Sequence, residues 1–255
     1  MDASMRYAQR HVSANPQNSE RDSLLRHRVI ALIEVLICSD YPTQLALGAT
    51  FAAFGFGPYT AQGQLRIAYV VGLSLADAAA LIGLILLFFH AHGERPRDVL
   101  VGRRPFPMEV AAGLPLILVA TGISIAVLVS IQHFAPWLHT VEQNPLQALL
   151  RSPRDAWLLA LVVVVAGGVR EEIQRAFLLH RFEGWLGGGV IGVIMTSAAF
   201  GAGHLTQGAD AAIATGLLGA FWGATYLRRR SAIAPIVSHS GFDLLQILLV
   251  TAVAR

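Results

Sequence analysis

Charged residues are scarce in this sequence. They make up 14% of the 255 residues, whereas apolar residues make up 55%. A soluble globular domain carries about 25% charged residues, so this chain has too few to cover a water-facing surface. Long apolar stretches in a chain of this size indicate an all-α, polytopic transmembrane helical bundle rather than a soluble domain.

Disulfides, lysine and a signal peptide are also missing. The single Cys38 cannot form an internal disulfide. All 19 basic residues are arginines that fall between apolar segments, so topology explains them better than a nucleic-acid partner does. Residues 1–27 lack the short apolar core and cleavage site of a signal peptide. We interpret them as a cytoplasmic, partly disordered tail before one helical domain at 28–255.

Seven apolar segments are long enough to cross a bilayer. They lie near 29–57, 65–91, 108–132, 156–180, 186–205, 209–227 and 231–254. Glu34, Asp40 and Pro42 interrupt the first segment. It would also fit an interfacial helix at about 22–40 followed by a span. The sequence therefore predicts seven to eight membrane helices.

The arginines follow an alternating pattern along the connections between these segments. They gather in the amino-terminal tail, in the stretch 93–107 and at Arg228–Arg230, while 57–65 and 205–210 hold none. The long connection 133–155 is an exception, but it carries acidic residues as well. Because cytoplasmic connections are enriched in arginine, the amino terminus is expected in the cytoplasm. Exclusive use of arginine, with abundant alanine and glycine, suggests the inner membrane of a bacterium.

Several ionisable residues fall at membrane depth. Such a residue costs roughly 2.5–3.5 kcal/mol on insertion scales, so it usually faces a protein interior and has a function. The residues concerned are Glu34, Asp40, Asp77, Arg170, Glu171, Glu172, Arg175, His204, His239 and Asp243.

The fourth segment places two adjacent glutamates beside an arginine. Glu171 and Glu172 precede Arg175 by four and three residues, so all three lie on one helix face. A structural ion pair between helices is one interpretation. The arginine leaves one carboxylate in excess, however, and two adjacent buried acids repel each other. One of them would then bind a proton readily, as a general base must.

Histidines in two later segments supply candidate partners. His204 ends a segment made slim by small residues, which lets a neighbouring helix approach closely. His239 and Asp243 are four apart on one helix face, a spacing that also fits a simple orienting hydrogen bond. Glu171 and His204 both lie about 15 residues from the turn at 183–189, hence at similar depth. His239 is expected nearer the cytoplasm, by about 10 Å.

Two chemistries suit this set of residues, and both hydrolyse an acyl bond. In one, a glutamate activates water and the histidines stabilise the oxyanion. In the other, zinc is bound by Glu171, His204 and His239, with Glu172 as the base. The familiar H-E-x-x-H helix is absent, so the zinc alternative lacks its usual signature.

Three motifs in order resemble the CPBP family of intramembrane proteases, which includes the CAAX prenyl endopeptidases and the bacteriocin-processing Abi proteins. They are the paired glutamates with an arginine, then Phe200-x-x-x-His204, then His239-x-x-x-Asp243. The resemblance covers about 155–250. It implies catalytic Glu171, Glu172, His204, His239 and Asp243, with Arg175 and Phe200 supporting the site. One departure is that two residues rather than three separate the glutamates from the arginine, which leaves the identity of the base open.

The family resemblance implies an eight-helix core open to the cytosol, and a membrane-associated peptide or protein substrate. It leaves open whether a metal takes part. We therefore predict a membrane endopeptidase that cleaves a membrane-associated or lipidated substrate with a glutamate-activated water. The alternatives are a non-catalytic immunity or scaffold protein, and a proton-coupled transporter in which Asp77 and the glutamates relay protons.

Overall fold

The computed structural model describes residues 16–142 and 144–253, and over these residues it is helical without a β-strand. The predicted all-α class is therefore confirmed. The longer helices are α2 (Pro16–Ile37), α3 (Tyr41–Ala53), α4 (Ile67–Ala91), α6 (Phe106–Phe134), α7 (Pro153–Val162), α8 (Glu171–Trp185), α9 (Gly189–Gly203), α10 (Ala209–Arg229) and α11 (Ile233–Val253). A π-helical segment, η3 (Val163–Arg170), joins α7 to α8, and the short helix α5 (Pro96–Leu100) follows α4.

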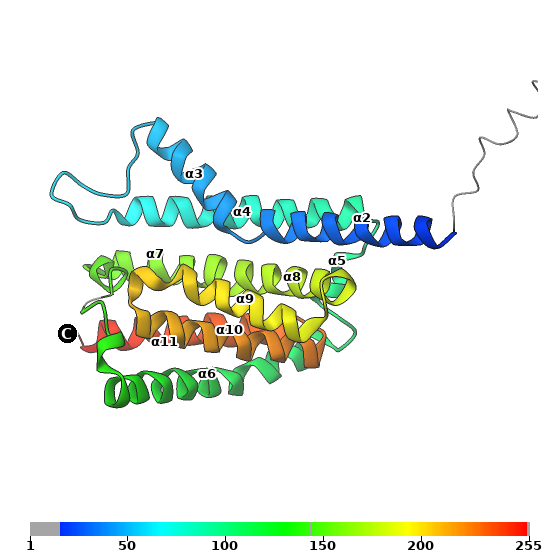
Figure 1. The fold of residues 1–255 in the computed structure, drawn as a ribbon. Coiled ribbons are helices and arrows are strands. Elements are labelled where there is room, and N and C mark those ends of the chain that lie inside the picture. The colour runs from blue at the N-terminus through cyan, green and yellow to red at the C-terminus, as the bar shows by residue number, and fades with distance from the viewer. Residues whose placement is uncertain (1–15, 143, 254–255) are drawn as a thin grey trace, which may run out of the picture.

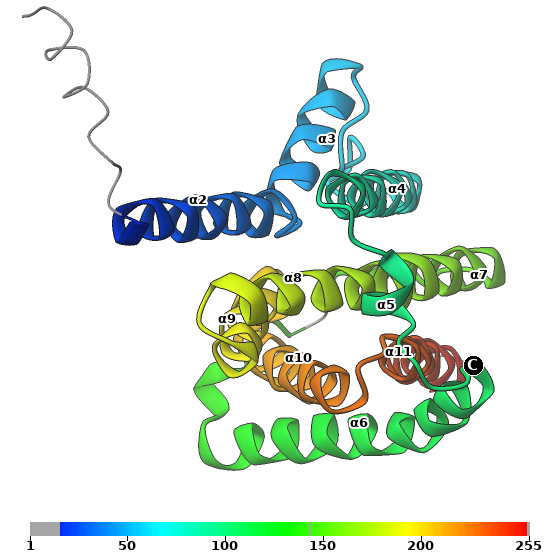
Figure 2. The ribbon, with the colours of Figure 1, turned by 90° about the vertical axis from the view of Figure 1, so that its right-hand side faces the viewer.

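The helices form layers. In both ribbon views α2, α3 and α4 lie on one side of α7, α8 and α9, and α10 and α11 come next (Figure 1, Figure 2). Helix α6 covers the side opposite α2 and α4. The α7–η3–α8 rod thus lies in the middle, between the amino-terminal layer and the carboxyl-terminal helices.

Fewer helices pass a test of length and hydropathy than the sequence predicts. Among the described residues, three are long and apolar enough to cross a membrane: 67–91, 106–134 and 233–252. A fourth results if α2 and α3, bent by 43° at their break, count as one span. The predicted seven to eight spans are not confirmed by this test. The rod carries the charged residues of the fourth predicted segment, and α9 has only 15 residues.

The amino-terminal region is helical from residue 16 onward. Residues 16–27, placed in the predicted tail, form the first part of α2, and residues 1–15 lie outside the described residues. The first predicted apolar segment is divided between α2 and α3, as in its two-part interpretation. Asp40 stands at the break with a φ of 81°, a value that residues with side chains rarely adopt.

The arginine-rich connections lie at one end of the bundle. The connection from α4 to α6 and the α10–α11 turn are at the end where α2 begins, together with the α8–α9 turn, which holds no arginine (Figure 1). The connections 54–66, 135–152 and 204–208 lie at the other end. Small residues bring neighbouring helices close together: a Cβ on Gly201 of α9 would lie 2.7 Å from the Ala212 carbonyl oxygen of α10.

Candidate active site

A π-helical segment precedes the paired glutamates. Residues Val163–Arg170 are wound more widely than an α-helix, and Glu171 follows directly. Such segments are rare and often occur at functional sites. Gly168 lies against α11, where an added Cβ would be 1.8 Å from Ser240 Oγ. The adjacent glycines Gly167 and Gly168 therefore let α11, with His239 and Asp243, approach the start of α8.

Glu172 is buried and fully engaged. Its side chain is 1% exposed. Arg175 Nε donates to its two oxygens at 3.1 and 3.3 Å, and His239 Nδ1 donates to Oε1 at 2.9 Å. Both oxygens already accept hydrogen bonds from the protein, so Glu172 is held in one orientation between α8 and α11.

Glu171 is more accessible and makes looser contacts. Its side chain is 15% exposed. One carboxylate oxygen lies 3.8 Å from His239 Nε2, and the other lies 3.6 Å from Arg170 NH2. Both distances exceed that of a hydrogen bond. The Glu171 carboxylate is therefore directed by charged neighbours while its lone pairs stay free.

His239 is fixed in three ways. Its ring stacks on Trp222 of α10, with centroids 3.8 Å apart and planes 17° apart. Its Nδ1 bonds to Glu172, and its Nε2 lies 3.6 Å from Asp243 Oδ2. Trp222 in turn donates to Ser238 Oγ at 3.1 Å. The imidazole plane is thus set before any substrate binds.

Phe200 connects the arginine to the other histidine. The guanidinium of Arg175 lies 4.7 Å from the Phe200 ring centroid, within cation–π range. The Phe200 ring meets His204 edge-on at 4.8 Å. His204 Nδ1 lies 2.8 Å from the Phe200 carbonyl oxygen and donates to it. This contact fixes the His204 tautomer and leaves Nε2 free for the cavity.

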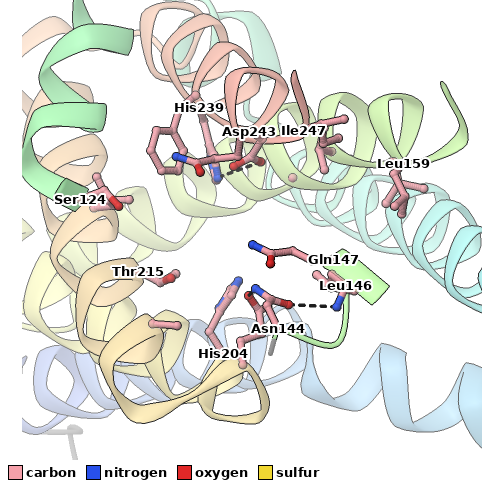
Figure 3. A pocket seen from close by; sticks show the side chains of 18 of the residues that line it. Ser124, Asn144, Leu146, Gln147, Leu159, His204, Thr215, His239, Asp243 and Ile247 are labelled. Atoms are coloured by element: carbon pink, nitrogen blue, oxygen red, sulfur yellow. Dashed lines mark hydrogen bonds and ion pairs between the residues drawn. The ribbon is translucent and has the colours of Figure 1, made fainter. Parts of the chain in front are cut away.

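A cavity of about 450 Å³ is lined by the residues that surround Glu172 and Arg175, namely Glu171, Phe200, His204, Trp222, His239 and Asp243. His239 and Asp243 lie on one side of it, His204 on the opposite side, and Gln147 projects between them (Figure 3). Asn144, Gln147 and Gln207 add neutral amides to a largely apolar lining. A second cavity of similar size lies between α2–α3 and α8–α9. Glu171 borders both cavities, as do Phe200 and His204.

The proposed zinc ligands do not fit a metal. Among the described residues, no group of three or more histidine, cysteine, aspartate or glutamate side chains is arranged to hold an ion. His239 Nδ1 is occupied by Glu172, and His204 faces His239 across the cavity. The set of Glu171, His204 and His239 therefore finds no geometric support.

His239 was expected nearer the cytoplasm than the paired glutamates, but in the structure it contacts Glu172. The turn before α11 accounts for this difference. Ser231 and Ala232 are buried, and Ala232 N donates to the Leu100 carbonyl of α5 at 2.9 Å. Because α5 covers this turn, α11 starts inside the protein and His239 reaches Glu172 within a few residues. His204, expected at the depth of Glu171, borders the same cavity as that residue.

Sequence reasoning missed several contributors to the site. Trp222 gave no signal, because an aromatic residue on an apolar helix is ordinary core. Arg175 was expected to fix both carboxylates, but it contacts Glu172. Arg170, which the sequence placed only among the ionisable residues at membrane depth, is the arginine that faces Glu171.

Comparison with known proteins identifies one family. Residues 153–245 match the model of the type II CAAX prenyl endopeptidase Rce1-like family. The matched segment runs from α7 into α11 and contains every predicted catalytic residue. No curated protein and no solved structure matches the chain.

Proposed function

Because residues 153–245 match the CAAX prenyl endopeptidase family, we propose that the chain is a CPBP-type intramembrane protease that hydrolyses a peptide bond of a membrane-associated or lipidated protein with a water activated by Glu171. The observation that carries this assignment is the difference between the two glutamates. Glu172 has both oxygens engaged, whereas Glu171 borders the cavity with its lone pairs free. A general base needs an accessible lone pair within reach of the water.

In this mechanism, Glu171 takes a proton from the water as the oxygen attacks the scissile carbonyl carbon. The carbonyl oxygen then becomes an oxyanion, and the Glu171 proton passes to the leaving amine as the tetrahedral intermediate collapses. His239, protonated between Glu172 and Asp243, would donate from Nε2 to that oxyanion. His204 would complete the oxyanion site or hold the water from the opposite wall.

Glu172, Arg175 and Phe200 position the reacting groups. Glu172 orients the His239 ring through Nδ1, and Arg175 neutralises Glu172. Phe200 lies between Arg175 and His204 and keeps both side chains in place. The three predicted motifs then act as one unit, although a single residue of the first, Glu171, performs the proton transfer.

We further propose that the seven predicted apolar segments cross the bilayer of a bacterial inner membrane, with the amino terminus in the cytoplasm. Exposed apolar side chains on α9, among them Val190 (72%), Ile194 (61%) and Met195 (56%), support this placement of a helix too short for the span test. The common end of the arginine-rich connections supports the orientation. The domain boundary expected at 27/28 would then fall within α2.

The activity can be tested by comparing wild-type protein with Glu171→Gln and His204→Ala. Membranes from a host that expresses each protein would be analysed for new peptide termini, and purified protein would be assayed on an internally quenched, prenylated peptide. The cleavage that the wild-type protein produces should be at least about 100-fold slower with either variant. Glu183→Gln, the same change on the same helix but outside the cavity, serves as the control. Equal cleavage by wild type and Glu171→Gln in both assays would refute the assignment.

A further inference from the structure

Two acidic residues from the amino-terminal half of the chain converge on Arg170, the residue before Glu171. Asp40, at the α2–α3 break, places Oδ2 3.0 Å from Arg170 NH1. Asp77, in the middle of α4, places Oδ2 3.7 Å from Arg170 Nε. Both acids lie outside the segment that matches the family. The amino-terminal layer therefore reaches the site through this cluster.

Arg170 is buried and held on two sides. It is 5% exposed. Its NH1 forms the ion pair with Asp40 and also donates a hydrogen bond to Gln174 Oε1 at 3.3 Å, one helical turn further along α8. Asp40 is itself fixed by Gln44, whose Nε2 donates to Oδ2 at 2.7 Å. A planar guanidinium that is anchored at one edge points its remaining nitrogen in a defined direction.

That remaining nitrogen faces the proposed base. Arg170 NH2 lies 3.6 Å from Glu171 Oε1, while Glu171 Oε2 lies 3.8 Å from His239 Nε2. The carboxylate is thus held between a guanidinium and an imidazole. Neither contact is close enough to cap its lone pairs with a hydrogen bond. This geometry orients a carboxylate and leaves it free to accept a proton.

Charge explains why an arginine stands there. Glu172 and Asp243 share the region with Glu171, and like charges in a poorly hydrated interior repel strongly. Arg175 is engaged with Glu172. Arg170 supplies the positive charge beside Glu171, and an uncharged donor would not replace it.

The cluster contains two features that destabilise the fold and that selection for stability would not retain. Asp40 has a φ of 81°, and Asp77 is 1% exposed with no hydrogen-bond partner for either oxygen among the described residues. Strained backbone and unpaired buried polar groups are concentrated at functional sites. Asp77 therefore acts on Arg170 through charge and not through a hydrogen bond.

We propose that Arg170, held by Asp40 and Asp77, is a positioning residue that orients the Glu171 carboxylate toward the cavity. This inference rests on the proposed function. It gives the amino-terminal layer a part in the reaction that acts through Arg170, because Asp40 at the α2–α3 break and Asp77 of α4 hold the guanidinium that faces the base.

The test compares Arg170→Gln, Arg170→Lys and the charge-balanced double variant Arg170→Gln/Asp77→Asn, with kcat, KM and thermal stability measured for each on the most rapidly cleaved peptide from the preceding assays. We expect Arg170→Gln to lower kcat roughly 10- to 100-fold with KM nearly unchanged. Arg170→Lys should recover part of kcat, because it keeps the charge. The double variant should recover stability but not kcat.

A purely structural role makes a different prediction. If Arg170 only neutralises buried acids, the double variant restores kcat together with stability, and that result would overturn the inference. Wild-type kcat in Arg170→Gln would overturn it as well. Glu109→Gln/Arg229→Gln removes an ion pair whose carboxylate is buried but which lies away from both cavities, and it should leave kcat unchanged.

Failure of the inference differs from failure of the proposed function. A fully active Arg170→Gln beside an inactive Glu171→Gln would reject the positioning role and keep Glu171 as the base. A fully active Glu171→Gln would reject the proposed function and the positioning role with it.

Discussion

The two adjacent glutamates should respond in opposite ways to the same substitution. Glu172→Gln removes a charge that is 1% exposed and leaves Arg175 buried without its counter-ion. Removal of one partner from a buried ion pair costs about 3–5 kcal/mol. Because the glutamine oxygen can still accept one hydrogen bond, we expect the low end, about 3 kcal/mol. In a chain of this size that is a fall in Tm of about 6–12 °C.

Glu171→Gln should scarcely change stability. The Glu171 side chain is 15% exposed and accepts no hydrogen bond from the part of the chain that the structure describes, since Arg170 and His239 lie 3.6 and 3.8 Å away. Loss of its charge also relieves repulsion from Glu172 and Asp243. We therefore expect a change in Tm below about 3 °C, which corresponds to less than about 1 kcal/mol. Cleavage, in contrast, should be lost.

The single cysteine, Cys38, allows the unfolding of each variant to be followed. Cys38 is 0% exposed at the end of α2, so a thiol-reactive fluorophore labels it only when the protein opens. Heating each purified variant with the fluorophore gives the Tm, and the peptide assay gives kcat for the same samples. Similar Tm values for the two variants, or a lower Tm for Glu171→Gln, would refute the division of roles.

Three further predictions concern the surroundings of the site. Arg181→Met should cost about 3 kcal/mol, measured as thiol labelling at a lower temperature, because the buried Glu34 loses the guanidinium now 2.5 Å away and keeps only His92 as a partner. A second substitution, Glu34→Gln, should recover part of this loss. Burial alone would raise the pKa of Glu94, but hydrogen bonds from Arg181 and a neighbouring histidine outweigh it, so its pKa lies below the ordinary 4.5. The stability that Glu94 contributes is therefore complete above pH 4.5 and lost as the pH falls through the lowered value, and Glu94→Gln should flatten a Tm-versus-pH curve in that range. Gly168→Ala should lower both Tm and cleavage, since its Cβ would lie 2.8 Å from Ser240 Cβ and push α11 away; wild-type values of both would show that the approach of α11 is not required.

Much of the carboxyl-terminal site could be predicted because its signals are local. Helical spacing relates Glu172 to Arg175 and His239 to Asp243, and both pairs are close in the structure. The family match covers the same residues. The spacing could not say which glutamate Arg175 contacts, because three and four residues both place side chains on the same helix face.

The number of membrane spans and the depth of His239 depended on packing between residues far apart in the sequence. The length and hydropathy test finds fewer spans than the sequence predicts, because a segment that carries buried ion pairs or forms a helix of only 15 residues does not meet its criteria. The depth of His239 depended on α5 covering the turn before α11, a contact between residues far apart in sequence.

Asp40 and Asp77 show most clearly where sequence reasoning ends. Each is conspicuous as an acid in an apolar segment, and each suggested a helix break or a proton relay when considered alone. Their common partner Arg170 lies 130 and 93 positions further along the chain, so neither spacing nor periodicity links them. An isolated acid at membrane depth requires a counter-charge, and Arg170 also stands beside Glu171. The charge that the amino-terminal layer needs for its own folding is thus the charge that faces the proposed base.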